Sequence, residues 1–171
     1  MFIIVREWSH GLCWSRAYWL ICNSRAGDGE RGRDFWLEHL ASAGIRDLHC
    51  HDFEEADWTE NLGYRDTVIV AGGDGSVNRA AAVCRATGAT LAILPSGTAN
   101  DFARNLGLPD QPQALCELIA SGITQTVDVA DYGDGIFLNV AHIGMGTLPA
   151  RESRGAEKKI LGRFCYGVEL L

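Results

Sequence analysis

Apolar runs of strand length alternate with helix-like segments through most of this chain, and few folds accommodate that alternation. AYWLICN (17–23), DTVIVAGGDGS (66–76) and TLAILPSGTAND (90–101) each start as a buried strand and end in a polar or glycine-rich turn. RGRDFWLEHLASAGI (31–45) and VNRAAAVCRATG (77–88) have helical spacing and a glycine near their ends. The pattern predicts an α/β fold with a mostly parallel, layered sheet and flanking helices.

The other segments are shorter or less regular. RDLHCHDF (46–53) is predicted to be a short strand and EEADWTENLGYR (54–65) a polar helix or loop. Residues 1–16 have no clear period and are treated as an N-terminal extension of uncertain structure. Further along, we expect a short helix in DFARNLGLP (101–109) that stops at Gly107 and Pro109, and another helix in 112–122. Alternating strands are expected in 124–132 and 135–144 around the turn YGDG.

Charge and composition exclude several classes of protein. The net charge is −7, which argues against nucleic acid as the main partner. Residues 28–66 hold eleven acids and four arginines, whereas 151–163 is basic and is read first as a solvated helix face. No stretch approaches the roughly 18 uncharged apolar residues of a membrane span, and the N-terminus lacks the pattern of a signal peptide.

The cysteines and histidines suggest structure rather than metal chemistry. Six scattered cysteines without a CxxC pair are expected to be reduced and mostly buried in a cytosolic protein. In a strand, His49 and His51 would share one face while Cys50 points to the other, which disfavours a zinc site in HCH.

The turn at the end of 66–76 is suited to bind phosphate. Gly72, Gly73 and Gly75 expose backbone N–H groups, and a helix follows directly. Asp74 would repel phosphate unless Mg²⁺ lay between them, so a nucleotide-phosphate site with Asp74 on the metal side is one interpretation. The other is a tight turn whose aspartate caps the helix at 76–78, and this turn alone does not decide between them.

A second turn, PSGTAND, favours the first interpretation. Gly97 allows close approach, Thr98 offers a hydroxyl, Asn100 an amide and Asp101 a carboxylate, although Asp101 also suits the N-cap of a short helix. A third acid, Asp128, is expected in an apolar strand where an unpartnered charge would be costly. Three acids from separate strand regions suit a shared hydrated cation.

Several common nucleotide and hydrolase motifs are absent. No lysine precedes Lys158, so there is no GxxxxGK loop, and no GxSxG motif occurs. GDGERG (27–32) matches GxGxxG, but Asp28 and Glu30 would face pyrophosphate without neutralisation, which disfavours a dinucleotide site.

GGDGSVN (72–78), followed by LPSGTANDFARNLGLP (94–109), resembles the catalytic domain of the diacylglycerol kinase family, which includes bacterial lipid kinases and sphingosine kinases. The resemblance extends from about residue 17 to 171. It implies a fold similar to the nucleotide-binding domains of NAD kinases and phosphofructokinases. It also implies ATP- and Mg²⁺-dependent phosphoryl transfer to the hydroxyl of a lipid.

The resemblance also implies roles for individual residues. The phosphate loop would be Gly72, Gly73, Asp74, Gly75 and Ser76, steadied by Asn78. Gly97, Thr98 and Asn100 would complete the cleft, Asn23 would begin the first nucleotide loop, and Asp74, Asp101 and Asp128 would form a water-linked network behind Mg²⁺.

The chain also departs from the family pattern. Ser24 replaces a proline, Ser76 a threonine, and Arg79 a glutamate. Family members continue into a β-rich substrate domain that supplies the catalytic base, so residues 17–171 are expected to bind Mg-ATP weakly and to be inactive alone, with no catalytic residue assigned. An apolar stripe in 158–171 would be left uncovered and available for oligomerisation.

Two alternatives remain: a kinase of a soluble acceptor with an NAD kinase-like fold, or a non-catalytic nucleotide-binding or interaction fragment. A cytoplasmic location is expected, with peripheral contact at the inner membrane face.

Overall fold

The structure is a computed structural model, and it describes residues 2–4, 17–27, 29–55, 57–133 and 135–138. The described residues all belong to one compact unit, residues 1–138. Predictions made for residues 139–171, including the basic segment and the apolar stripe, lie outside the described residues.

One six-stranded sheet organises this unit, with strand order β3-β2-β4-β5-β1-β6. Its centre is the parallel set β3 (Leu48–Asp52), β2 (Tyr18–Cys22), β4 (Thr67–Gly72) and β5 (Thr90–Pro95). The short β1 (Phe2–Ile4) pairs antiparallel with β5 and parallel with β6 (Thr124–Gln125). The predicted mostly parallel sheet is therefore confirmed, and residues 2–4 of the expected extension join it.

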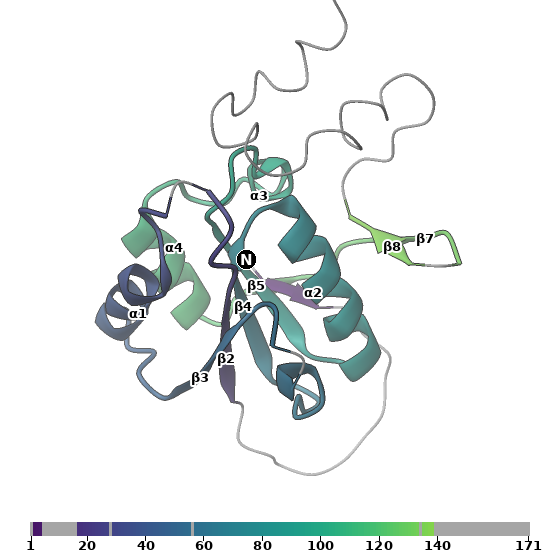
Figure 1. The fold of residues 1–171 in the computed structure, drawn as a ribbon, viewed down its shortest axis with the longest axis horizontal. Coiled ribbons are helices and arrows are strands. Elements are labelled where there is room, and N and C mark those ends of the chain that lie inside the picture. The colour runs from purple at the N-terminus through teal and green to yellow at the C-terminus, as the bar shows by residue number, and fades with distance from the viewer. Residues whose placement is uncertain (1, 5–16, 28, 56, 134, 139–171) are drawn as a thin grey trace, which may run out of the picture. The chain divides into compact units, whose positions relative to one another are not determined.

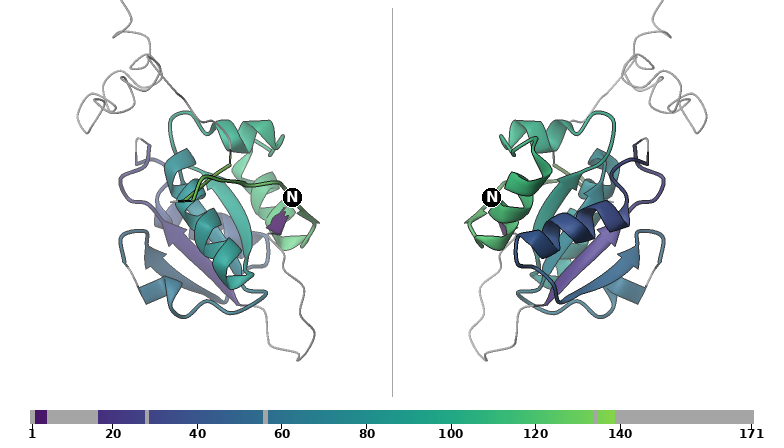
Figure 2. Two further views of the ribbon diagram at one scale, coloured as in Figure 1. Left: turned by 90° about the vertical axis from the view of Figure 1, so that its right-hand side faces the viewer. Right: turned by 90° about the vertical axis from the view of Figure 1, so that its left-hand side faces the viewer.

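Two helical layers cover the sheet. α2 (Asp74–Thr87) lies on one face, and α1 (Arg33–Ser42) and α4 (Pro112–Ala120) lie together on the other (Figures 1 and 2). Alternating residues of β2, β4 and β5 serve each layer, because a strand buried on both sides points successive side chains to opposite faces. The helices predicted in 31–45, 77–88 and 112–122 are thus confirmed.

Turn residues end the helices where the sequence predicts. α2 ends at Gly88, which has φ +75°, a left-handed conformation that closes the helix by a bond from its N–H to the Cys84 carbonyl. Short α3 (Asp101–Asn105) follows the turn after β5. The described residues of the polar segment after β3 contain one 3₁₀ turn, η1 (Asp57–Thr59), consistent with the expected helix or loop.

The expected strand 124–132 is wrong over most of its length. β6 ends at Gln125, and strand structure returns only in the hairpin of β7 (Ala130–Asp131) and β8 (Ile136–Phe137), which does surround the YGDG turn. Val127 and Val129 still pack partly on the core, so the alternation reflects half-burial, and no partner strand pairs with them among the described residues. Asp128 is consequently exposed and outside any strand, contrary to expectation.

The cysteines of the described residues are free, as expected. Cys22, Cys84 and Cys116 are buried, whereas Cys50 is partly exposed. Burial raises the pKa of the Cys84 thiol to about 12 and that of Cys22 to about 11, so neither is a thiolate at neutral pH. No helix among the described residues is long and apolar enough to cross a membrane.

Candidate functional site

Three loops meet at the carboxyl edge of the parallel strands. They follow β2 (residues 23–27), β4 (73–76) and β5 (96–101), and strand register places their starts side by side, with Gly72 opposite Pro95. In an open α/β sheet this edge is where ligands bind. The two glycine-rich turns therefore share one edge, as predicted.

The loops after β4 and β5 touch through their backbones. A Cβ added to Gly97 would lie 2.5 Å from the Gly73 Cα, and one added to Gly73 would lie 3.3 Å from the Gly97 Cα. The Ser96 N–H donates to the Gly72 carbonyl at 3.1 Å, which ties the loops together. Glycine is needed here because no side chain fits between the two chains.

The first loop approaches just as closely. Gly27 has φ +70°, and a Cβ there would collide with the Ser96 carbonyl oxygen. Asn23 begins this loop, as predicted, and its Nδ2 donates to the Ser76 Oγ at 2.7 Å. Its Oδ1 accepts from the Arg25 N–H at 2.9 Å. Asn23 therefore joins the first loop to the first turn of α2, whereas a direct contact with nucleotide stays a prediction.

Asp74 connects the second loop to the third. Its Oδ1 accepts from the Phe102 N–H at 2.9 Å and its Oδ2 from the Asp101 N–H at 3.2 Å. Asp74 thus caps α3, and the alternative in which it caps the helix at 76–78 is wrong, because α2 begins after Gly73 without a side-chain cap. Backbone N–H groups at a helix start favour a carboxylate at this position.

Asn100 and Asp101 have contacts within their own loop and helix, while their roles toward nucleotide and Mg²⁺ stay predictions. The Asn100 side chain closes the loop on itself: Oδ1 accepts from the Gly97 N–H at 2.9 Å, and Nδ2 donates to the Gly97 carbonyl at 2.7 Å. Asp101 is the first residue of α3 rather than its N-cap, and it pairs with Arg104 at 3.6 Å. Thr98 and Gly75 are exposed on the two loops.

Asn78 binds away from the phosphate loop. Its Nδ2 donates to the Ile136 carbonyl of β8 at 2.8 Å, so the hydrogen bond described for this side chain fastens the hairpin to α2. Its Oδ1 is buried without a partner among the described residues. Among the described residues, no hydrogen bond joins the Asn78 side chain to residues 72–76, so its expected role in steadying that loop has no support from its contacts.

The three predicted metal acids do not form a compact cluster. Among the described residues, only His51, Glu55 and Asp57 bring three ligand atoms within 4.8 Å of one another. Asp74 already accepts two backbone N–H groups, and Asp128 is exposed. A direct three-carboxylate centre is therefore not present, while the water-linked arrangement that the resemblance implies remains a prediction.

Two further residues support the site without a sequence signal for this role. The indole of Trp36, fully buried in α1, donates from Nε1 to the Ser96 Oγ at 2.9 Å. Arg79, which stands where the family has glutamate, lies 5.0 Å over the Phe53 ring and so finds an aromatic partner instead of an ionic one.

Known proteins resemble this chain in sequence and in fold. A family model described as the diacylglycerol kinase catalytic domain matches residues 17–132. A probable lipid kinase YegS-like of Chromohalobacter salexigens is 30% identical over 164 residues, which cover 88% of this chain and 51% of that protein. The corresponding protein of Citrobacter koseri is 38% identical over 159 residues, covering 86% and 52%.

Solved structures give the same relationship. A crystal structure of a diacylglycerol kinase from Bacillus anthracis superposes with a TM-score of 0.58 at 31% identity, covering 72% of this chain and 48% of that one. A second, of a putative diacylglycerol kinase from the same organism, gives 0.59 at 33% identity, again covering 72% and 48%. The chain thus spans about half the length of the relatives it matches.

Proposed function

The chain belongs to the family of diacylglycerol kinase catalytic domains, and from that premise we propose that it is the nucleotide-binding part of an ATP- and Mg²⁺-dependent lipid kinase. In this proposal the γ-phosphoryl group of ATP goes to the hydroxyl of a lipid met at the membrane surface. The length of the relatives supports a second half that completes the acceptor site. The 171-residue chain alone then binds nucleotide without turnover.

The backbone contact between Gly73 and Gly97 is the observation that carries the proposal. It places the start of a 14-residue helix, α2, next to an exposed loop at the ligand-binding edge. The N–H groups of Asp74, Gly75 and Ser76 have no intrahelical acceptor, because they lie in the first turn of that helix. They are available for phosphate oxygens, and the positive end of the helix dipole favours the same charge.

Side chains around this edge complete the proposed phosphate site. Thr98 is exposed and offers a hydroxyl, while the Asn100 amide fixes the loop that presents it. Because phosphoryl transfer depends mainly on positioning and charge neutralisation, a rigid cradle of this kind supplies much of what the donor half must provide.

Oxygen donors at the same edge fit Mg²⁺. A carboxylate has about four lone-pair positions, so Asp74 retains acceptor capacity after binding two N–H groups. Asp74 and Asp101 lie at this edge, and we assign them to hold hydrated Mg²⁺ through water, since the ion keeps several waters in such sites. Asp128 follows β6, which runs opposite to β5, so its place in this network rests on the family resemblance alone. When bound, Mg²⁺ neutralises charge on the phosphates.

Nucleotide titration tests the proposal. Calorimetry of the 171-residue chain with ADP or ATP should give saturable binding in Mg²⁺ that weakens when EDTA removes the ion. Asp74→Ala should lower the affinity at least tenfold. Asp34→Ala is the matched control, because Asp34 also lies in the first turn of a helix but is exposed on α1. No saturable binding, or equal losses in both variants, contradicts the assignment.

A further inference from the structure

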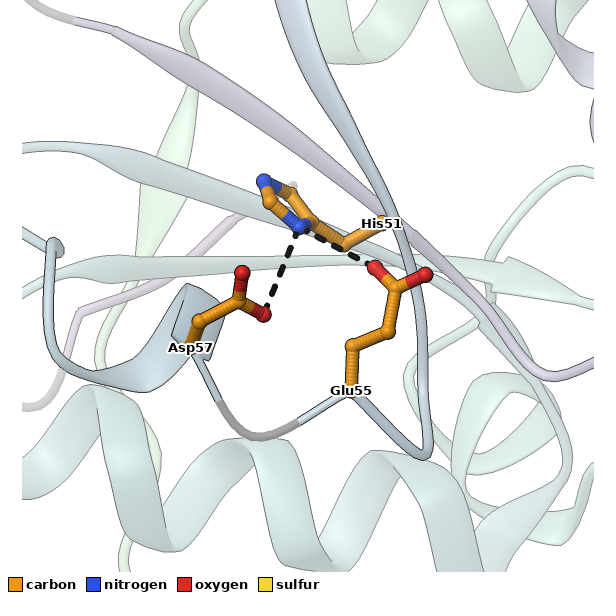
Figure 3. Close-up of side chains that lie close together, drawn as sticks. All are labelled: His51, Glu55 and Asp57. Carbon is orange, nitrogen blue, oxygen red and sulfur yellow. Dashed lines mark hydrogen bonds and ion pairs between the residues drawn. The ribbon is translucent and has the colours of Figure 1, made fainter.

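Three side chains of different types meet beside β3, away from the phosphate loops. His51 is in the strand, Glu55 in the turn after it, and Asp57 begins η1. The His51 Nδ1 lies 3.2 Å from the Glu55 Oε2 and 3.9 Å from the Asp57 Oδ1 (Figure 3). Both carboxylates turn toward the same imidazole nitrogen, so one nitrogen and two oxygen donors face a common point.

Packing holds the imidazole in place. Trp19 of β2 stacks on His51 with ring centroids 5.6 Å apart and an interplanar angle of 23°, and on His49 at 4.4 Å. The two histidines therefore share a face, as the sequence predicts. Only 22% of the His51 side chain is exposed, so its ring has little freedom to leave the carboxylates.

The described residues on both sides of the two acids are also anchored. Phe53 precedes it and Trp58 follows it, and both are buried in the core with ring centroids 6.4 Å apart. The Glu55 Oε2 additionally accepts from the Asp52 N–H at 3.1 Å. Donors on such a fixed scaffold lose little entropy when an ion binds.

The charge at this place is not neutralised by the described part of the chain. No arginine of the described residues forms an ion pair with Glu55 or Asp57, and the nearby Arg25 pairs with Glu54 at 3.9 Å. His51 is their common partner, and it carries a charge only when it is protonated. The surrounding stretch 28–66 is strongly acidic, which adds to the attraction for a cation.

We propose that His51, Glu55 and Asp57 form a site for a divalent transition-metal ion of the Zn²⁺ type, with solvent completing the coordination. Donors around a tetrahedral ion with bonds of about 2.0–2.1 Å lie about 3.3 Å apart, close to the separations of 3.2 and 3.9 Å from the His51 Nδ1. The imidazole nitrogen selects such ions over Mg²⁺, which prefers oxygen ligands.

The proposed ion has a structural consequence for the neighbouring loop. It would bind residues 55 and 57 to β3 and so fix the turn from which Glu54 reaches Arg25 of the first loop. The site does not depend on the proposed kinase function, because it shares no residue with the glycine turns.

Metal titration of the 171-residue chain tests this site. Zn²⁺ should bind with one-to-one stoichiometry in calorimetry, and Co²⁺ should give visible absorption without a sulfur charge-transfer band. His51→Gln should weaken Zn²⁺ binding by about 100-fold or more, because losing a residue that only hydrogen-bonds a metal ligand already costs about 10–100-fold. His49→Gln is the matched control, because His49 has the same strand, face and aromatic neighbour but lies outside the cluster.

Two more variants separate the possible causes. Asp57→Asn removes a 69% exposed carboxylate, so it should weaken Zn²⁺ binding while the urea unfolding curve stays unchanged. Asp74→Ala should leave Zn²⁺ binding intact and thereby distinguish this site from the nucleotide site. An absence of saturable Zn²⁺ binding, or equal losses in His49→Gln and His51→Gln, would overturn the proposal, because the cluster would then be an ion pair only. A sulfur charge-transfer band with Co²⁺ would also overturn it, because cysteine would then bind the ion.

Discussion

The strand β4 has an aspartate near each end, and the two acids have opposite surroundings. Asp66 precedes Thr67 at the amino end, is 8% exposed, and accepts from the Trp19 Nε1 at 3.0 Å and from two backbone N–H groups, of Ala17 and Gly63. Asp74 lies beyond the carboxyl end, is half-buried, and accepts two N–H groups of α3.

The two carboxylates that flank β4 therefore have different environments. At the amino edge three donors surround the buried carboxylate of Asp66, so this side chain links β2 and the segment before it to the turn that precedes β4. At the carboxyl edge the protein supplies two donors to Asp74, which lies in the first turn of α2 and stays partly accessible. The two acids differ mainly in burial, since Asp66 is enclosed by the protein whereas Asp74 remains partly accessible at the edge where ligands bind in open α/β sheets.

Asp66→Ala should cause the largest loss of stability. The change leaves three buried or partly buried donors without their acceptor, and each unsatisfied group costs about 1–3 kcal/mol, so we expect a loss of about 3 kcal/mol or more. Urea unfolding measures it, with the exposed Asp47→Ala as a control expected within about 0.5 kcal/mol. A loss as small as the control's would remove the structural role of Asp66.

Gly97→Ala should come next, because the carboxyl edge leaves no room between its loops. Its new methyl would meet the Gly73 Cα at 2.5 Å, and overpacking of this kind costs about 1–3 kcal/mol. Nucleotide affinity should fall with it, since the loops separate. Gly75→Ala adds a methyl in open space in the first turn of α2 and should keep or slightly raise the melting temperature. Equal melting temperatures for both variants would contradict the close approach.

Asp74→Ala should destabilise the protein less than Asp66→Ala does. It removes the cap of α3, which is worth about 1 kcal/mol, and water can replace it at this half-exposed position. Asp74→Asn keeps one oxygen acceptor and should lose less still. Thermal unfolding compares the three proteins, and a loss for Asp74→Ala that equals the loss for Asp66→Ala would erase the distinction between the two edges.

The smallest effect is expected at the surface pair of Arg85 and Asp131. The Gly133 N–H and then the Arg85 guanidinium, 2.6 Å away, hold the pKa of Asp131 below its usual value. Because the folded-state pKa is lowered, this contribution to stability is present above the unfolded pKa and is lost as pH falls through the folded pKa.

Arg85→Ala should raise the pKa of Asp131 toward its ordinary value, which a carboxyl NMR titration detects. The difference in unfolding free energy between the two proteins should shrink on acidification. An unchanged Asp131 titration would assign the whole shift to the Gly133 N–H.

Local patterns predicted the strands and helices because the apolar residues repeat with the period of each element. The common edge of the two glycine turns followed from the rule that parallel strands end together. The same reasoning misplaced Asp128, since alternating Val127 and Val129 look alike whether a partner strand is present or the chain only rests on the core.

Side-chain partners distant in sequence were not predictable. Asp74 reaches Phe102, Asn78 reaches Ile136, and Trp36 reaches Ser96 across 28, 58 and 60 residues. Each bond depends on how layers pack, and a single sequence has no local signal for that. The predicted glycines do lie where the loops approach closely, whereas the roles of the carboxylates and amides toward a ligand stay predictions.

The hydrogen bond between Trp36 and Ser96 connects the helical layer of α1 and α4 to the loop that follows β5. A ligand that moved the Ser96 hydroxyl would deprive the buried indole of its acceptor, and α1, which carries the indole, packs against α4. The fluorescence of the Trp36 indole would therefore report on a change at Ser96. Substitutions that repack α1 against α4 would in turn change how firmly the loop after β5 is held.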